Sequence, residues 1–346
     1  MKRRIQLEEV KVKLTAMLGI EFPIIQAPMA GVTTPEFVAA SAEAGILGSI
    51  GAGYLSVEDT RTFIRKVMVL TERPFAVNLF VPEQVEVNQK ALRRAYEALQ
   101  PIGREIGIPF WNAPLSEPDF DGQVRLLIEE GVKVCSFTFG LPDELTIRTL
   151  KENGLFLIGT ATTVEEAVLA EKAGMDAVVA QGSEAGGHRG SFSGDLTFIP
   201  LNELLSEVVP SVEIPVIAAG GIANKEMKEQ ARSAGAQAVQ IGTALLATDE
   251  SGAHSLYKRA VLEAGEGCTV LTRAFSGKTA RGICNRFIKE MKDAEIAPYP
   301  YQNDLTKEIR KEAAKRGKSE FMSLWAGEKV SMSTDGKLKE VIGRFI

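Results

Sequence analysis

Cysteine and histidine are both scarce in this chain of 346 residues, and their scarcity argues against several classes of protein. The three cysteines, Cys135, Cys268 and Cys284, show no C-x-x-C spacing and are odd in number. This pattern argues against a disulfide framework or a zinc site, and it fits a reducing compartment. The two histidines, His188 and His254, lie far apart without acidic ligand spacing nearby, so we expect no metal.

The chain also lacks an excess of basic charge and long apolar runs. The formal net charge is −5 and the pI is about 5.5, whereas nucleic-acid-binding proteins normally carry a basic excess. The most basic stretch, 307–318, is interrupted by glutamates and is typical of a solvated helix face. No apolar run is long enough to cross a bilayer or to form a signal peptide. We therefore expect a cytoplasmic protein that binds neither nucleic acid nor membrane.

Short apolar runs recur along the chain and predict strands that are buried on both faces, as in a parallel sheet. The predicted strands are Pro23–Met29, Ile46–Ile50, Phe75–Phe80, Lys133–Phe139, Leu155–Thr160, Asp176–Gln181, Pro215–Ala219 and Ala236–Ile241. Helical patterns separate them, and eight strand–helix units in about 250 residues are typical of an α/β (β/α)8 TIM barrel. An open doubly wound sheet is the alternative, but its G-x-G-x-x-G motif is missing.

The helix boundaries carry recognisable capping signals. Thr34 precedes Pro35, an arrangement that favours a helix start. Ser56 and Thr163 each stand three residues before an acid, as in a capping box. Glycines placed to form left-handed helix ends precede three of the strands; they are Gly45, Gly174 and Gly235.

Two regions do not fit a simple barrel, and we expect them to form a smaller, partly helical cap domain over the active site. One is 81–131, where Leu92, Ala95, Tyr96 and Leu99 follow helical spacing. The other is 265–346. The barrel, which we expect to bind the cofactor, would then comprise 18–80 and 132–264.

Residues at the predicted strand ends point to a cofactor, because functional groups of a TIM barrel project from the carboxyl ends of its strands. Glycines in the loops after strands 7 and 8 could cradle a phosphate with backbone N–H groups. Three side-chain amides at strand ends could meet the polar edge of a flavin. The predicted cofactor-binding residues are Ala27, Pro28, Met29, Asn78, Gln181, Gly186, Gly187, Gly220, Gly221, Gln240, Ile241, Gly242 and Thr243.

The loop after the sixth strand carries the principal catalytic candidate. Gly186 and Gly187 allow close backbone approach, and His188 follows them as a group that could transfer a proton or bind an anion. Glu184 in the same loop is expected to serve the loop itself. His254 lies where a helix should begin, and we expect a structural role for it.

Several motifs together resemble those of the FMN-dependent nitronate monooxygenases, over about residues 18–310. They are 26–31 (QAPMAG), 45–53, 74–80 (PFAVNLF), 136–140 (SFTFG), 181–188 (QGSEAGGH), 219–222, 240–243 and 280–287 (ARGICNRF). The resemblance implies a capped barrel with FMN at its mouth, and His188 as the active-site histidine. Thr138 replaces a histidine that some members carry, and Tyr299, Tyr301 and Lys307 match the family's tail near the cap.

The activity that this resemblance implies is oxidation of alkyl nitronates, such as propionate 3-nitronate, by O2 to a carbonyl compound and nitrite. A cationic or hydrogen-bonding His188 would hold the anionic substrate, or His188 would act as a base. One alternative is an NAD(P)H-dependent FMN reductase on the same scaffold, either an enoyl-ACP reductase or a quinone reductase. Another is a flavin- or phosphate-binding barrel without catalysis, such as a sensor. The sequence does not indicate an oligomeric state.

Overall fold

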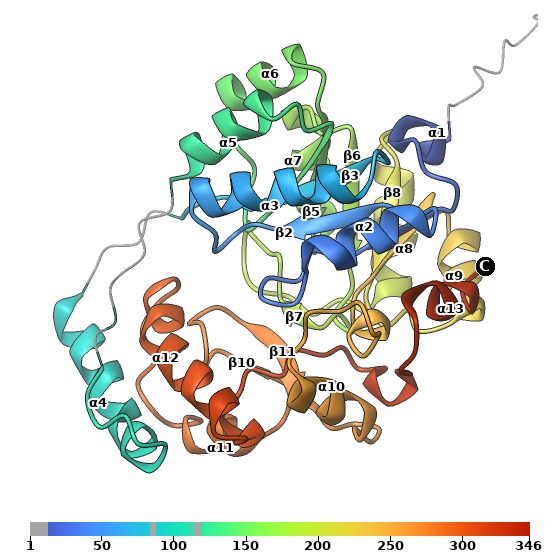
Figure 1. Cartoon of the computed structure of the whole chain (residues 1–346). Coiled ribbons are helices and arrows are strands. Elements are labelled where there is room, and N and C mark those ends of the chain that lie inside the picture. Colours follow the sequence, from blue (N-terminus) through green and yellow to red (C-terminus); the bar gives the residue numbers. More distant parts are fainter. Residues whose placement is uncertain (1–12, 84–87, 112, 114–118) are drawn as a thin grey trace, which may run out of the picture.

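Eight parallel strands form the central sheet of the protein, as the sequence predicts (Figure 1). The computed structural model describes residues 13–83, 88–111, 113 and 119–346. The strands are β1 (Ile24–Gln26), β2 (Gly48–Gly51), β3 (Phe75–Phe80), β4 (Val134–Thr138), β5 (Phe156–Ala161), β6 (Ala177–Gln181), β8 (Val216–Ala219) and β9 (Ala238–Ile241). Each predicted strand is therefore confirmed, with ends shifted by no more than a few residues.

The sheet closes into a barrel at the seam between β1 and β2. The strand order is β1-β9-β8-β6-β5-β4-β3-β2, and a parallel bridge joins Ile25 to Leu47 across the two ends. The buried amide of Gln26 completes the seam, because its oxygen accepts from Ser49 N at 3.0 Å and its nitrogen donates to Ser49 O at 3.2 Å. The fold is therefore an α/β TIM barrel, as predicted.

Helices cover the outside of the barrel and build the second part of the molecule. The α-helices are α1 (Leu14–Leu18), α2 (Pro35–Glu43), α3 (Val57–Leu70), α4 (Gln89–Glu105), α5 (Phe120–Glu129), α6 (Glu144–Glu152), α7 (Val164–Ala173), α8 (Leu201–Val208), α9 (Lys225–Ser233), α10 (Ser255–Leu262), α11 (Arg286–Glu290), α12 (Tyr301–Lys315) and α13 (Leu338–Gly343). Short 3-10 helices are η1 (Val209–Ser211), η2 (Thr243–Leu245), η3 (Ser319–Phe321) and η4 (Val330–Met332). None of the helices in the described ranges is long and apolar enough to cross a membrane.

The predicted helix starts and ends are confirmed. The side chains of Thr34, Ser56 and Thr163 each accept a backbone N–H in the first turn of their helix. Gly45, Gly174 and Gly235 have φ of 81°, 100° and 101°, which is the left-handed conformation that glycine adopts without steric cost.

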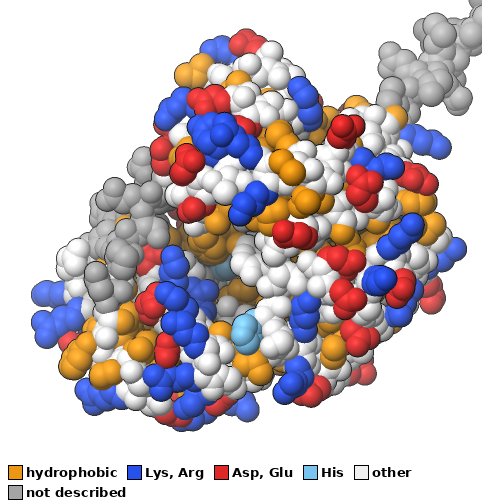
Figure 2. Space-filling view, in the orientation of Figure 1, with side chains coloured by type: hydrophobic (Ala, Val, Ile, Leu, Met, Phe, Trp, Pro, Cys, Tyr) orange, Lys and Arg blue, Asp and Glu red, His pale blue; other side chains and the backbone are white. Residues whose placement is uncertain are grey.

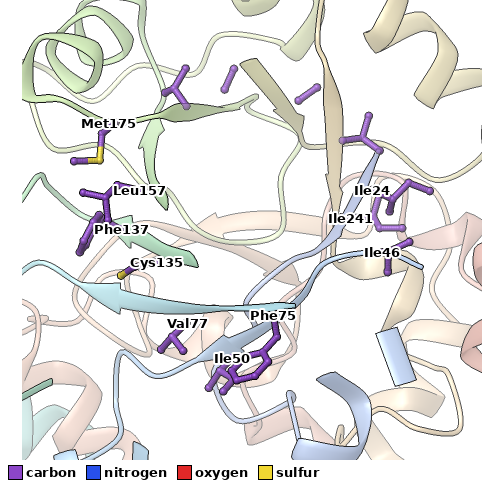
Figure 3. Packing of buried hydrophobic residues seen from close by; sticks show 14 of the residues in the cluster. Ile24, Ile46, Ile50, Phe75, Val77, Cys135, Phe137, Leu157, Met175 and Ile241 are labelled. Carbon is purple, nitrogen blue, oxygen red and sulfur yellow. The ribbon is translucent and has the colours of Figure 1, made fainter. Parts of the chain in front are cut away.

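The barrel has two apolar layers because its strands alternate between inside and outside. Outward side chains such as Val77, Phe137 and Leu157 pack beneath the surrounding helices (Figure 3). Inward side chains such as Val134 and Ile158 form a separate cluster with Leu14 and Leu18. Helix α1 therefore closes the floor of the barrel, while the extension before residue 13 lies outside the described residues.

A cap lies against the open end of the barrel, below it in Figure 1. Its helix α4 packs on α12, and the predicted apolar face of Leu92, Ala95, Tyr96 and Leu99 contributes to their shared core. A three-stranded sheet of β10 (Thr269–Thr272), β11 (Ala280–Ile283) and β7 (Gly187–His188) joins the cap to the barrel. Because β7 belongs to the loop after β6, this sheet places His188 at the junction.

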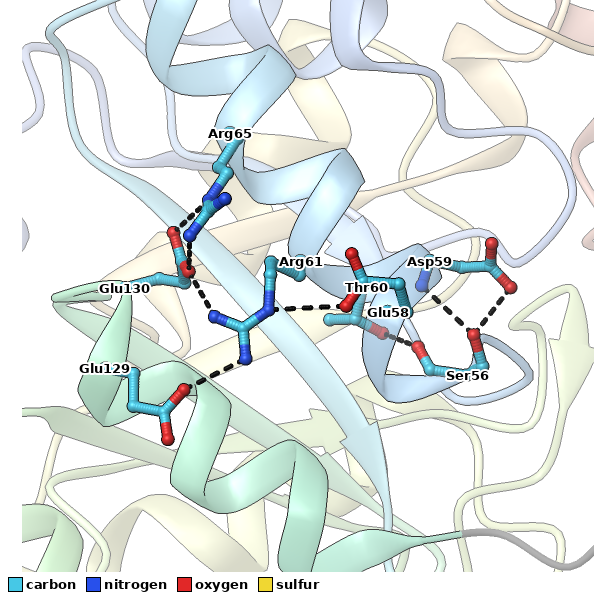
Figure 4. Close-up of polar contacts among 8 residues, drawn as sticks. All are labelled: Ser56, Glu58, Asp59, Thr60, Arg61, Arg65, Glu129 and Glu130. Atoms are coloured by element: carbon cyan, nitrogen blue, oxygen red, sulfur yellow. Dashed lines mark hydrogen bonds and ion pairs between the residues drawn. The ribbon is translucent and has the colours of Figure 1, made fainter.

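Two helices within the predicted cap ranges pack on the barrel instead. Helix α5 contacts α3, β3 and α6, while α13 contacts α2. Figure 4 shows how Arg61 and Arg65 of α3 bind Glu129 and Glu130 at the end of α5, with N–O distances of 2.7 to 3.0 Å. The boundaries 81–131 and 265–346 stay a prediction, and we propose that α5 and α13 belong to the barrel.

Candidate active site

A cavity of about 1080 Å³ lies at the carboxyl ends of the strands, between barrel and cap. Figure 2 shows that the surface is hollowed there, with Lys and Arg side chains on the cap side of the opening. All the predicted site residues line this cavity, namely Ala27, Pro28, Met29, Asn78, Gln181, Gly186, Gly187, His188, Gly220, Gly221, Gln240, Ile241, Gly242 and Thr243. The structure thus brings together residues that are spread over more than 200 positions of the sequence. This is expected, because the carboxyl ends of all the strands of a barrel meet at one face.

Bare backbone forms one end of the cavity, after β8 and β9. Gly220 and Gly221 have φ of 117° and 68°, so a side chain at either position would be strained. A Cβ on Gly242 would lie 3.3 Å from the Cβ of Ala27, which leaves little room for a larger residue. These loops can present N–H groups to a phosphate, and they fit the phosphate end of FMN.

The C-terminal segment closes this end of the cavity, which the sequence did not indicate. Gly327 N donates to Thr243 Oγ1 at 3.0 Å, and a Cβ on Gly327 would lie 2.7 Å from Glu184 O. Lys329 also lines the cavity and has an exposed side chain. The segment therefore adds a cation to a site whose two glycine loops contain none.

The three predicted amides differ in the polar atoms that they leave for a ligand. Gln181 is occupied, because it donates to His188 O at 3.1 Å and accepts from Gly190 N at 2.8 Å. Asn78 uses its Nδ2 on Ser136 and Thr138 of β4. Gln240 makes no side-chain hydrogen bond to any part of the chain that the structure describes. Gln181 thus holds the histidine loop, while Asn78 Oδ1 and the Gln240 amide remain for a flavin edge.

His188 is held from one side by Ser276, with 2.8 Å between Nε2 and Oγ. Ser276 Oγ also lies 3.1 Å from Lys278 O and accepts from Lys278 N at 3.3 Å. A hydroxyl can either donate to or accept from an imidazole nitrogen, so this contact orients the ring of His188 and is compatible with either neutral tautomer. Sequence reasoning missed Ser276, which lies 88 positions away in the loop between β10 and β11.

Aromatic side chains surround the imidazole on its other sides. The ring centroids of Phe139, Tyr299 and Trp325 lie 5.6, 6.4 and 5.4 Å from that of His188. Phe139 has φ of 72°, an unfavourable conformation for a residue with a side chain, and such strain is common at functional sites. Trp325 is positioned by the Tyr257 hydroxyl, which donates to its carbonyl oxygen.

This environment keeps the imidazole neutral. Burial, together with the nearby charges of Arg310 and Lys278, lowers the pKa of His188 to about 3. The sequence allowed either a cationic or a neutral, hydrogen-bonding His188. The lowered pKa favours the neutral form in the ligand-free site at neutral pH. His188 is instead available as a hydrogen-bonding group or as a weak base.

The tail of the chain contributes three more polar groups to the cavity. Tyr299, Lys307 and Arg310 line it, whereas Tyr301 packs against the core of the cap. Burial raises the pKa of Tyr54 to about 12 and raises that of Tyr299, so both hydroxyls stay protonated. Tyr54 and Tyr299 are also hydrogen-bonded to each other.

Part of the stretch 307–318 departs from the predicted solvated helix face. Lys311, Lys315 and Arg316 are exposed and pair with glutamates of the same helix, but Arg310 faces the cavity. Asn303, Lys307 and Arg310 recur at helical spacing and share one side of α12. That spacing was a signal from which the inward face could have been predicted.

The two remaining candidates have the structural roles that the sequence predicts. His254 is the N-cap of α10 and accepts from Leu256 N at 3.3 Å, although its side chain also lines the cavity. Glu184 accepts the Leu201 N–H with both carboxylate oxygens, at 3.0 and 3.1 Å. It therefore anchors its loop to the start of α8.

Comparisons with known proteins agree with this geometry. Relatives from Staphylococcus aureus (strain MSSA476) and Staphylococcus haemolyticus (strain JCSC1435), both named probable nitronate monooxygenase, are 44% identical. They match 97% and 96% of this chain and 96% of their own lengths. The solved structure of nitroalkane oxidase from Streptomyces ansochromogenes has a TM-score of 0.90 at 40% identity, covering 96% of both chains.

A second solved structure shares the scaffold at lower similarity. FabK from Thermotoga maritima has a TM-score of 0.76 at 33% identity, covering 96% of this chain and 93% of its own. The sequence model of the family described as nitronate monooxygenase matches residues 11–346. This chain therefore belongs to the nitronate monooxygenase family, a family of oxidoreductases that act on nitro compounds.

Proposed function

We propose that this protein is an FMN-dependent enzyme that oxidises alkyl nitronates, such as propionate 3-nitronate, with O2 to a carbonyl compound and nitrite. The observation that carries the proposal is a neutral, firmly oriented histidine facing a cavity with a glycine-lined end. The family membership supports the reaction type, and the cavity supports a flat cofactor together with a small substrate.

FMN, when bound, supplies the electron transfer, and the chain supplies binding and orientation. The N–H groups around Gly220, Gly221 and Gly242 would hold its phosphate, with Lys329 adding charge. Asn78 and Gln240 would meet the polar edge of its ring system. Ala27, Pro28 and Met29 would pack against it from the end of β1.

His188 suits a substrate that reaches the site already ionised. A base with a pKa of about 3 is poorly matched to the removal of a proton from a neutral nitroalkane near neutral pH. As a neutral group, the imidazole can contact a nitronate without a proton transfer. We therefore infer that nitronates are used in preference to the neutral nitroalkanes from which they form.

Anaerobic mixing tests the proposal. The purified flavoprotein is mixed with propionate 3-nitronate, with nitroethane, or with NADH and NADPH, and the flavin absorbance is followed. Rapid change with the nitronate and slow change with nitroethane is expected. His188→Ala should bind FMN normally and lose nitronate turnover by a factor of about 10–100, the range for loss of a hydrogen bond to a charged group.

Two outcomes of the same experiment would replace the proposal. Full bleaching by a nicotinamide without any response to nitronate would identify an NAD(P)H-dependent reductase of the same scaffold. Turnover by His188→Ala at the wild-type rate would show that the histidine has no part in the reaction. No response to any of these compounds would favour a flavin-binding protein without catalysis.

A further inference from the structure

A partly buried guanidinium group faces the cavity on the cap side. Arg310 is fixed by three acceptors, since Nη2 donates to Asn303 O at 2.9 Å and to Asn303 Oδ1 at 2.8 Å, while Nε lies 3.4 Å from Thr306 O. All three acceptors are neutral. Within the described ranges Nη1 makes no hydrogen bond, and the residue lines the cavity. Arg310 therefore presents donors to the space where a substrate would lie.

The charge of Arg310 is only partly compensated. Among the described residues no carboxylate lies within ion-pair distance of its guanidinium, and Tyr54 and Asp304 act on it only as weaker electrostatic neighbours. Burial is the largest influence and lowers the pKa of Arg310, because the charged form has lost water. A desolvated cation of this kind gains most from a bound anion.

The other cations near the site are less suited to this task. Lys278 is ion-paired with Glu83 and lies 4.6 Å from the centre of the Phe139 ring. Lys307 is exposed to solvent, which weakens its interaction with a ligand. Lys329 follows the segment that contacts Thr243, at the glycine-lined end of the cavity. Of these cations, Arg310 combines partial burial, fixed orientation and an open donor face.

We propose that Arg310 is the residue that binds the negative charge of the substrate, next to a neutral His188, and so selects anions over neutral compounds. The inference rests on the proposed nitronate oxidation for the identity of the anion. In this arrangement Arg310 provides the positive charge that attracts the anion, and the neutral His188 contacts the substrate as a hydrogen-bonding group. A nitronate is an anion with two oxygens, and the open N–H groups of Arg310 Nη1 can donate to it in charge-assisted hydrogen bonds.

The test compares Arg310→Met and Arg310→Lys with a matched control, Arg316→Met. Arg316 lies on the same helix, is half exposed and pairs with Glu312 at 2.7 Å, away from the cavity. Steady-state KM and kcat are measured with ethyl nitronate and with propionate 3-nitronate. The Kd of nitrate, a planar anion that resembles the nitronate group, is measured by titration of the FMN-bound protein.

Arg310→Met should raise the Kd of nitrate and the KM for nitronates by about 10–100-fold, the range for loss of a charged hydrogen bond. Arg310→Lys should lie between this variant and the wild type, and Arg316→Met should equal the wild type. Loss with both nitronates would place the nitronate group at Arg310. Loss with propionate 3-nitronate alone would place the second anionic group, the carboxylate, there.

Unchanged nitrate binding and unchanged KM values in Arg310→Met would overturn the inference. If that variant does not fold, a crystal structure of the wild type with nitrate decides, because nitrate away from Arg310 contradicts the proposal. The proposed function can fail separately. If the wild-type protein does not oxidise nitronates but binds nitrate through Arg310, the anion site is supported and the proposed reaction is wrong.

Discussion

His188 is the residue whose state most constrains the chemistry, and its neutrality follows from burial beside two cations. A lowered pKa means that the imidazole stays neutral at every pH well above 3 and takes up a proton only below that range. We therefore expect kcat/KM for a nitronate to show no acid limb near 6.5, the ordinary pKa of histidine. A pH profile from 4 to 8 checks this, and an inflection near 6.5 that disappears in His188→Ala would contradict it.

Ser276 orients the ring of His188 and is the second residue with a testable effect. Removing its hydroxyl removes the hydrogen bond that holds Nε2 and allows the imidazole to rotate. Ser276→Ala should therefore lower kcat for nitronates by about 3–10-fold, the range for loss of one neutral hydrogen bond, with FMN binding unchanged. Ser206→Ala, which alters an exposed hydroxyl on α8, serves as the control. A kcat equal to the wild type would show that the aromatic neighbours alone orient the ring.

At the scale of single elements, Glu166 shows how one helix start organises the loop beside the active site. Thr163 caps α7 as predicted, but the carboxylate of Glu166 does not return to the N-cap. It accepts from Thr162 N at 2.6 Å and, on its other oxygen, from Phe192 N and Ser193 N at 2.6 and 2.9 Å. The side chain is fully buried, and the Thr162 N–H is buried with it, whereas Phe192 and Ser193 are partly exposed.

Glu166→Ala should therefore destabilise the protein by about 1–3 kcal/mol, the cost of leaving a buried donor such as the Thr162 N–H without a partner. Urea unfolding measures the change. Glu165→Ala is the matched control, because Glu165 is exposed on the same turn and should alter stability by less than about 0.5 kcal/mol. Equal effects of the two substitutions would show that the loop at 191–193 finds other acceptors.

The same scale shows which elements the sequence could predict. Strand positions and helix caps depend on neighbours within a few residues, so short apolar runs, Thr34-Pro35 and the terminal glycines sufficed. The use of Gln181 could not be predicted in this way. Its amide binds His188 O and Gly190 N, and these partners depend on the path of the loop rather than on the strand.

For the whole molecule, cofactor binding should be linked to stability, because the cavity lies between barrel and cap and is lined by both. Adding FMN to the cofactor-free protein at about 100 times its Kd should stabilise it by about 2.7 kcal/mol. Riboflavin, which lacks the phosphate, should stabilise it less at the same concentration. Thermal unfolding with each compound tests this, and equal stabilisation would argue against a phosphate site in the glycine loops.

The boundary between barrel and cap is also a property of the whole molecule. Helix α5 lies within the long connection after β3, where length alone suggested a cap segment, yet it packs on α3 through Glu129 and Glu130. Helix α13 returns to α2 from the end of the chain. Sequence order could not indicate these contacts, because each depends on which surface of the barrel remains uncovered.

The sequence by itself determined the barrel, its strand ends, the glycine loops and the choice of His188, because these depend on local periodicity, turn chemistry and family motifs. Only the tertiary structure decided the neutral state of His188 and its partners Ser276, Trp325 and Arg310. These residues come from distant segments of the cap. The physical reason is that burial and electrostatic neighbours are properties of the folded cavity, and no spacing along the chain records them.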